Sequence, residues 1–165
     1  MNITYKLNKD QINWQEVADV LDRSQLSHLP ADQQEIVFRN SYAVVFVYDD
    51  ERIVGVARAL SDGICQAAIY NVALDEEYQG HGIGRRMIEL LLEQLKGQNV
   101  ILYTHPQTVA MYEKFGFRRN KTALCYFDIE KEHLDWMEQE GFFQPEGYRF
   151  VDEYNRPDME WTRTK

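Results

Sequence analysis

The sequence contains few basic residues relative to acidic ones, only two cysteines, and no long hydrophobic run. Its 18 lysines and arginines stand against 27 aspartates and glutamates, so the formal net charge is −9 at pH 7. A nucleic-acid partner is therefore not expected, because phosphate binding requires a basic surface. The acidity either suits a cationic partner such as an amine or simply maintains solubility.

No apolar run approaches the roughly 18 residues of a membrane span, so neither a membrane partner nor a signal peptide is expected, and cytoplasm is the default compartment. Cys65 and Cys125 both lie in apolar, strand-like runs. We expect them to be small buried hydrophobic residues rather than a disulfide or metal pair. His28, His81 and His133 lack metal-ligand spacing, and no metal is predicted.

The hydrophobic content of 44% over 165 residues is enough for a packed core of ordinary domain size. The most informative stretch is 67–96, where an apolar run to Leu74 is followed by a polar turn and three glycines, Gly80, Gly82 and Gly84. Apolar residues then recur at helical spacing and predict a helix that Gly97 is placed to end; they are Ile83, Met87, Ile88, Leu91, Leu92 and Leu95.

Glycines just before a helix remove Cβ atoms where backbone must approach another group closely. The first N–H groups of a helix have no intrahelical partner and carry partial positive charge. This combination predicts a seat for phosphate or pyrophosphate, and the alternative is a tight turn without a ligand. A dinucleotide fingerprint would need a small residue in place of Arg85, and a P-loop would need glycine followed by lysine, so neither motif fits.

Two motifs in order carry a family resemblance. The first is Gln/Arg-x-x-Gly-x-Gly, here Gln79, Gly82 and Gly84, and the second is the Tyr-x-x-x-Gly-Phe ending at 112–117. Together they resemble the GNAT N-acetyltransferase superfamily, well over 42–127, loosely in the N-terminal segment, and not in the last 38 residues. The resemblance implies an α/β (α+β) fold: a mixed, mostly antiparallel sheet with one splayed parallel strand pair, flanked by helices.

The expected elements follow from periodicity and turn signals. Asn13 and Glu16 read as a capping box, in which the Glu16 side chain returns to the first residue of the helix. Gly55 indicates a bulge or a close neighbour within its strand. Strands are predicted at 3–7, 42–48, 52–60, up to Leu74, 100–103 and 122–129; helices are predicted at 13–26, from Pro30, from Gly84 to Lys96, at 106–114 and at 130–140.

The segment 128–165 carries 11 acidic and 5 basic residues together with seven aromatic ones. Acidity alone would suggest a solvated tail, whereas the aromatic density favours packing. We expect a GNAT-like domain over 1–127 and an extension over 128–165 that packs on the same domain or on a partner subunit. A dimer arm, and hence a possible homodimer, and a lid over the acceptor pocket both stay open.

The resemblance assigns acetyl-CoA as co-substrate and implies where it binds. Backbone groups around Val72 and Leu74 would bind pantetheine and direct an N–H at the thioester oxygen. The amides of Gln79, Gly80, His81, Gly82, Ile83 and Gly84 would take the pyrophosphate, with Arg85 or Arg86 either adding a contact or lying solvated. His105 stands where many relatives have an asparagine that contacts the CoA arm; it either replaces that donor or is an ordinary loop histidine.

Tyr112 matches the tyrosine taken as general acid in many relatives, or else it packs beside Phe115 and Phe117. Tyr70 and Asn71 are candidates for positioning substrate or water. The general base stays unassigned, because Ala68 occupies the position where some relatives carry a glutamate. A water chain to residues 75–77, which are expected to form a solvated turn, is one route for the proton, and loss to bulk solvent before binding is the other.

The resulting prediction is an enzyme that moves an acetyl group from acetyl-CoA to a primary amine, on a small molecule or a protein, by direct attack. No serine or cysteine is in a nucleophile setting, so no acyl-enzyme is expected. The alternative is a CoA-binding regulatory protein that keeps the cleft and has lost catalysis.

Overall fold

A computed structural model describes residues 1–120 and 122–144. The chain forms two compact units, Met1–Leu102 and Tyr103–Lys165, which are described separately below. Of the extension's aromatic residues, Tyr148, Phe150, Tyr154 and Trp161 lie outside the described residues. The domain boundary expected at residue 127 stays a prediction.

The first unit is built on a five-stranded sheet with the order β1-β2-β3-β4-β5. Neighbouring strands from β1 to β4 are antiparallel, and β4 and β5 are parallel. The mixed, mostly antiparallel fold predicted from the sequence is thus confirmed. The strands are β1 (Ile3–Lys6), β2 (Ala43–Asp49), β3 (Arg52–Ser61), β4 (Gln66–Leu74) and β5 (Asn99–Ile101).

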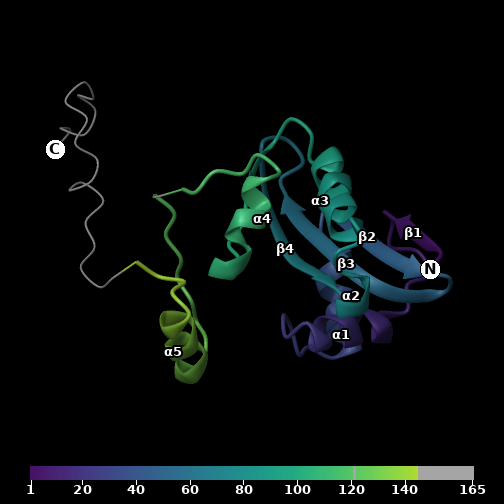
Figure 1. Cartoon of the computed structure of the whole chain (residues 1–165), viewed down its shortest axis with the longest axis horizontal. Helices are drawn as coiled ribbons and strands as arrows, with labels where there is room; N and C mark the ends of the chain where they lie inside the picture. Colours follow the sequence, from purple (N-terminus) through teal and green to yellow (C-terminus); the bar gives the residue numbers. More distant parts are fainter. Residues whose placement is uncertain (121, 145–165) are drawn as a thin grey trace. The chain divides into compact units, whose positions relative to one another are not determined.

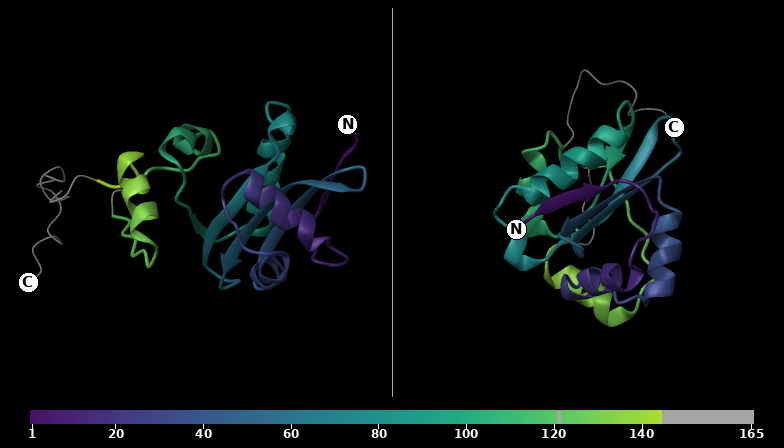
Figure 2. Two further views of the ribbon diagram at one scale, coloured as in Figure 1. Left: turned by 90° about the horizontal axis from the view of Figure 1, so that it is seen from below. Right: turned by 90° about the vertical axis from the view of Figure 1, so that its right-hand side faces the viewer.

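Helices cover both faces of this sheet (Figures 1 and 2). The helices α1 (Trp14–Arg23) and α2 (Ala31–Arg39) lie on one face, and α3 (Ile83–Gln94) packs against β2 and β3 on the other. The core between the sheet and α1 and α2 is apolar and nearly inaccessible to solvent. It consists of Ile12, Val17, Val20, Leu21, Phe38, Val44, Phe46, Ile53, Val56 and Ala73.

The parallel pair is short. Its register runs from Gln66 opposite Asn99 to Ala68 opposite Ile101, and there the ladder ends. Strand β4 continues to Leu74, and no strand among the described residues pairs with this second half on the β5 side. Backbone polar groups on an unpaired edge are available to other partners.

Two irregularities shape the centre of the sheet. Gly55 pairs with Val47 and lies next to a bulge in β3; a Cβ placed on it would stand 2.8 Å from Leu74 Cδ1 and 3.1 Å from the Ala73 carbonyl oxygen. Both readings of Gly55, bulge and close neighbour, are confirmed. Between β3 and β4 the register shifts again, because Val56 pairs with Ala73 whereas Arg58 pairs with Tyr70.

The capping box is half confirmed. Asn13 Oδ1 accepts a hydrogen bond from the Glu16 amide at 3.4 Å, as predicted for an N-cap. The Glu16 carboxylate does not return to Asn13, however: its Oε2 accepts from the Ile53 amide at 2.9 Å. The reason is tertiary, since that amide lies beside the β3 bulge and the α1 side chain reaches it across the packed face.

The second unit contains the 3-10 helix η2 (Pro106–Thr108), the helix α4 (Val109–Glu113) and the helix α5 (Lys131–Gln139). Rings of the extension pack within this unit: Phe142 lies 5.4 Å from His105 and Phe143 lies 5.9 Å from Phe127. The strand predicted at 122–129 is wrong, because no described residue there is in a strand and Leu124 is 98% exposed. A β-prone run does not form a strand without a neighbour to pair with.

The prediction of two buried cysteines is also wrong, since Cys65 and Cys125 are both exposed. Cys65 falls in a turn before β4, where Asp62 Oδ1 accepts hydrogen bonds from the amides of Ile64, Cys65 and Gln66. The strand β4 begins at Gln66, so Cys65 belongs to the turn and not to the strand. Cys125 lies in the unpaired run at 122–129.

Candidate active site

The glycine loop connects the end of β4 to α3 through the 3-10 helix η1 (Glu76–Tyr78). Gly82 is the N-cap of α3, with φ +81°, and Gly80 has φ +79°. These are left-handed conformations that favour glycine with or without a ligand. No side chain caps α3, and its first turn contains no acidic residue. The helix N-terminus thus keeps its partial positive charge available to an anion.

Gly84 differs from its neighbours. It stands in the first turn of α3, outside the left-handed region, and an added Cβ would meet only Leu74 Cδ2 at 3.9 Å, which is ordinary contact. The fold would accept alanine there, and a helix prefers alanine to glycine by about 1 kcal/mol. The protein's own packing consequently does not explain why position 84 lacks a side chain.

Polar contacts fasten the start of the loop. Asp75 is buried and receives two hydrogen bonds from Arg23, Nε to Oδ1 at 3.0 Å and Nη2 to Oδ2 at 2.8 Å. The Asp75 amide donates to the Val54 carbonyl at 2.9 Å, and Gln79 Nε2 donates to the Leu74 carbonyl at 3.1 Å. The expectation of a fully solvated acidic turn is wrong for Asp75, because α1 supplies a guanidinium that sequence spacing does not reveal.

Tyr78 and Arg52 continue this network. The Tyr78 hydroxyl donates to Asp49 Oδ2 at 2.9 Å and accepts from Arg52 Nη2 at 3.2 Å, and Arg52 also pairs with Glu77 at 2.7 Å. The hydrogen bond to Asp49 raises the pKa of Tyr78, and the donors from Asn2 and Tyr78 lower the pKa of Asp49. The loop is therefore anchored to the β2–β3 hairpin as well as to α1.

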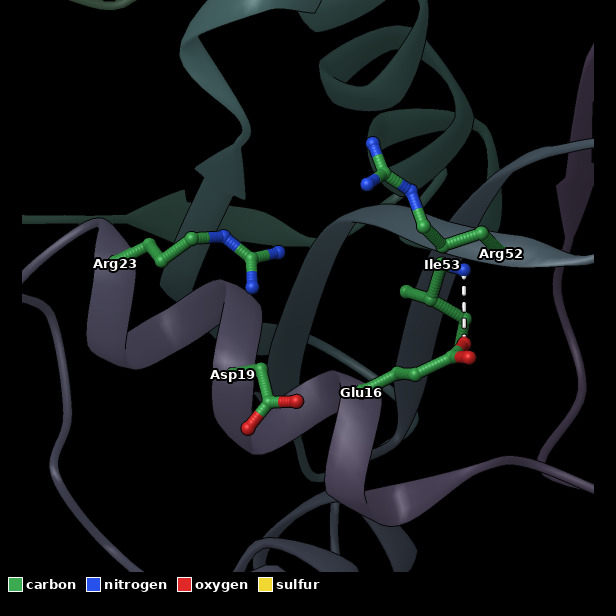
Figure 3. A pocket seen from close by; sticks show the side chains of 5 residues that line it. All are labelled: Glu16, Asp19, Arg23, Arg52 and Ile53. Carbon is green, nitrogen blue, oxygen red and sulfur yellow. Dashed lines mark hydrogen bonds between the residues drawn. The ribbon is translucent and has the colours of Figure 1, made fainter.

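A pocket lies beside these anchors (Figure 3). It is lined by Glu16, Asp19, Arg23, Arg52 and Ile53, which come from α1 and the start of β3. Its charged groups are already engaged: Glu16 with the Ile53 amide, Asp19 with the Gln15 side chain, Arg23 with Asp75, and Arg52 with Glu77. We attribute these charges to positioning the loop.

The second half of β4 carries the other candidate residues of this unit. Asn71 has φ +51°, and Asn71 and Val72 together stand opposite Ala57 where the register shifts. The Asn71 Oδ1 accepts from Arg58 Nε at 2.6 Å, and the Arg58 guanidinium lies 5.1 Å from the centre of the Tyr70 ring. Arg58 is not among the predicted site residues, although it is a lone charge inside the apolar run 53–60.

The predicted site residues thus divide between the two units. Tyr70, Asn71, Val72 and Leu74 lie on β4 in the first unit; Gln79, Gly80, His81, Gly82, Ile83, Gly84 and Arg85 follow in its loop and first helical turn. Tyr112 and His105 belong to the second unit. Their proximity to the loop stays a prediction.

Within the second unit, Tyr112 is buried on α4 and its ring meets Phe117 edge-on at 5.8 Å. Burial raises the pKa of Tyr112. The His105 Nδ1 accepts from the Gln107 amide at 3.2 Å, and its Nε2 lies 3.2 Å from Glu140 Oε2. His105 is therefore not an unattached loop residue: it caps η2 and contacts the C-terminal end of α5.

A family model described as "Acetyltransferase (GNAT) family" matches residues 10–117, well over half of the chain. The chain belongs to this family. The match includes α1, the whole sheet from β2 onward, the glycine loop and the Tyr112 motif. The resemblance seen in the sequence is confirmed. Among the residues the structure describes, no cluster of three or more potential metal ligands is present, and no helix is long and apolar enough to cross a membrane.

Similar proteins agree with this assignment. The chain is 28% identical over 120 residues to an uncharacterized N-acetyltransferase, ycf52, of Pyropia yezoensis, covering 68% of this chain and 69% of that protein. It is 37% identical over 78 residues to the chloroplastic GCN5-related N-acetyltransferase 2 of Arabidopsis thaliana, covering 46% of this chain but only 30% of that protein. Because the latter is chloroplastic, the comparison does not support the cytoplasmic prediction.

A solved structure shows the same fold. A protein of unknown function from Staphylococcus aureus, SA2161, described as a probable acetyltransferase, superimposes with a TM-score of 0.66 at 21% identity, covering 77% of this chain and 99% of that one. At this identity the likeness concerns the fold alone. It agrees with the five-stranded arrangement described above.

Proposed function

We propose that this GNAT family member transfers an acetyl group from acetyl-CoA to a primary amine by direct attack. The observation that carries the proposal is the uncapped N-terminus of α3, reached through an open glycine loop at the end of β4, whose second half has no strand partner on the β5 side among the described residues. Gly84 adds support, because its missing side chain leaves room that the fold itself does not need.

In this proposal the amides of 79–84 hold the diphosphate, and the free edge of β4 around Val72 and Leu74 holds the pantetheine arm. When bound, acetyl-CoA supplies the activated acyl carbon that the amine attacks. A backbone N–H of β4 polarises the thioester carbonyl. Gln79 keeps the loop attached to β4 by its hydrogen bond to the Leu74 carbonyl, which fixes the distance between the two binding segments.

Tyr112 is proposed as the proton donor to the departing sulfur. Its raised pKa keeps the phenol protonated over the range in which the enzyme would be assayed, although it widens the mismatch with a thiol of pKa about 8.5. A phenol within hydrogen-bond reach of the sulfur tolerates such a mismatch. His105 is proposed as a further contact to CoA only when Glu140 releases its Nε2.

The amine must be neutral to attack. Among residues 75–77, the candidates for draining its proton, Asp75 and Glu77 are paired with Arg23 and Arg52, and Glu76 is exposed to solvent. We therefore favour an acceptor that loses its proton to bulk solvent before it binds. For such an acceptor, kcat/KM rises about tenfold per pH unit below the pKa of the free amine. A plateau that ignores the acceptor's own pKa would instead identify a base on the enzyme.

The CoA site is tested by comparing Gly84→Glu with Gly84→Gln. Glutamate and glutamine both have a higher helix propensity than glycine, so both substitutions should stabilise α3. The glutamate carboxylate also interacts favourably with the helix dipole, so Gly84→Glu should be the more stable variant by about 0.3–1 kcal/mol. The same charge should repel a diphosphate at the N-terminus. We expect CoA to bind Gly84→Glu at least tenfold more weakly than Gly84→Gln in calorimetry. Equal CoA affinities would remove the proposed diphosphate site.

Catalysis is tested by thiol release at fixed acetyl-CoA across small amines, amino acids, polyamines and peptides. Release with any of them supports the enzyme. The second candidate is a CoA-binding regulator, and it is favoured by one observation: Ala68 occupies the strand position where a glutamate base would stand. CoA binding without release across the panel would establish that alternative.

A homodimer and a cytoplasmic location stay predictions, to be tested by sedimentation and by localisation in cells.

A further inference from the structure

Arg58 carries a charge on the face of the sheet that α1 and α2 cover. In β3 it stands directly opposite Val44 of β2 and Tyr70 of β4. Directly paired residues of an antiparallel ladder point to the same face, and Val44 belongs to the apolar core on that face. The side chain of Arg58 consequently starts beside the core, and it is half-buried.

The neighbours of this guanidinium are neutral. Nε donates to Asn71 Oδ1 at 2.6 Å, Nη1 donates to Ser41 Oγ at 3.4 Å, and Cζ lies over the Tyr70 ring, 5.1 Å from its centre. No ion pair within 1–120 and 122–144 includes Arg58. Other arginines in the same range are paired with carboxylates: Arg23, Arg39, Arg52, Arg86 and Arg119.

A half-buried cation without a counter-charge is unfavourable, and proteins usually pair such groups. Desolvation lowers the pKa of Arg58, and only Tyr70 acts in the opposite direction. Nη2 has no hydrogen-bond partner among the described residues. Every fully buried side-chain nitrogen or oxygen atom among these residues does have a hydrogen-bond partner, so Nη2 is not fully buried. The N–H groups of Nη2 therefore reach solvent, where a ligand can contact them.

The location of Arg58 connects it with the proposed reaction. Its main partner, Asn71, is a non-glycine residue in a left-handed conformation within the β4 bulge. Such strained residues concentrate at functional sites. Asn71 also lies in the part of β4 beyond Ala68, where the β5 ladder has ended. The open donors of Arg58 are thus held next to the strand segment assigned to the thioester.

We propose that Arg58 binds a carboxylate on the acceptor, so that the substrate is an amine that also carries a carboxylate, such as an amino acid. This inference rests on the proposed acetyltransferase function. The planar fork of a guanidinium matches the two oxygens of a carboxylate, and binding would provide the counter-charge that no described residue supplies there. Asn71 and Tyr70 would orient the fork by holding Nε and one face of the guanidinium plane.

The test compares alanine, leucine, phenylalanine and lysine with their amides in the thiol-release assay, using wild type, Arg58→Gln and Arg58→Lys. Because the two amines of a pair differ in pKa, the informative quantity is the change in the acid-to-amide ratio of kcat/KM between proteins. We expect Arg58→Gln to lower that ratio by about tenfold to a hundredfold for the preferred acceptor. Arg58→Lys keeps the positive charge but not the planar fork, so its ratio should lie between those of wild type and Arg58→Gln. It also replaces Arg58→Gln in the test if the glutamine variant does not fold.

Arg39→Gln is the matched control, because the Arg39 side chain is exposed and is paired with Glu35. Its ratio should equal that of wild type. An acid-to-amide ratio that is the same in wild type and Arg58→Gln would overturn the inference while leaving acetyl transfer intact. The inference would also be overturned if the enzyme preferred O-phosphoethanolamine to ethanolamine but preferred no amino acid to its amide. That result would indicate that Arg58 binds a phosphate and not a carboxylate.

Absence of thiol release from every amine would refute the proposed function instead. The carboxylate site is then decided by thermal shift with the N-acetylated forms of the same four pairs, in the presence of CoA. Stabilisation of wild type by an N-acetyl amino acid but not by its amide, lost in Arg58→Gln, supports the site. Equal shifts for acid and amide overturn it.

Discussion

Gly55→Ala should destabilise the protein, since position 55 is a point of close contact between β3 and the end of β4. The added Cβ would stand 2.8 Å from Leu74 Cδ1, 3.1 Å from the Ala73 carbonyl oxygen and 3.2 Å from Val47 Cγ2. The Leu74 methyl can rotate away, but the carbonyl oxygen belongs to the β3–β4 ladder and cannot move without shifting the strand.

The magnitude follows from two opposing effects. Overpacking a dense site costs about 1–3 kcal/mol, and replacing a strand glycine by alanine returns about 0.5–1 kcal/mol of backbone entropy. The net loss is about 0.5–2 kcal/mol. For a domain of this size 1 kcal/mol corresponds to roughly 2–4 °C, so the thermal midpoint should fall by about 1–8 °C.

The assay is thermal and urea unfolding followed by circular dichroism, with Gly84→Ala as the matched control. Gly84 faces the same Leu74 side chain from α3, but at 3.9 Å and in a helix, so its alanine variant should be as stable as wild type or more so. A Gly55→Ala protein that melts at or above the wild-type temperature would refute the close-contact reasoning. If Leu74 also helps to hold pantetheine, Gly55→Ala should weaken CoA binding as well.

Three further outcomes are expected. Asp75→Asn should lower the free energy of unfolding by about 1–2 kcal/mol, because it removes the charge of a buried carboxylate whose partner Arg23 is half exposed. Urea unfolding midpoints measure this change, and an unchanged midpoint would show that the Arg23–Asp75 pair does not hold the loop. Tyr112→Phe should lower turnover at least tenfold with little change in CoA affinity, and unchanged turnover would remove its role as acid. Three backbone amides lower the pKa of Asp62, so its contribution is present above the unfolded value near 3.9 and is lost as pH falls below it. Asp62→Asn should accordingly be less stable than wild type at pH 7 and approach it between pH 4 and pH 2; a pH-independent difference in midpoint would contradict this.

Sequence reasoning succeeded where the signal was local. Periodic apolar residues placed α3, the turn glycines placed its beginning, and apolar runs between turn signals placed the strands of the sheet to within about two residues. It failed where the outcome depends on a distant partner. Glu16 has the right spacing for a capping box, yet the amide it satisfies belongs to Ile53 on another element.

The same cause explains the other errors. The run at 122–129 has the composition of a strand and no pairing neighbour among the described residues, so its side chains other than Phe127 are exposed, Cys125 included. From the sequence, Asp75 is expected to lie in a solvated turn. In the structure its carboxylate is buried and paired with Arg23 of α1. Arg58 reads as one polar residue in a strand until its neighbours are seen to be neutral.

By itself the sequence determined the family, the order of the main elements and the position of the glycine loop before α3, because each is encoded in residues adjacent along the chain. Only the tertiary structure decided which charges are neutralised and which are not. Hydrogen bonds and ion pairs join residues as far apart as Arg23 and Asp75, and the energy of a buried charge depends on what surrounds it in space.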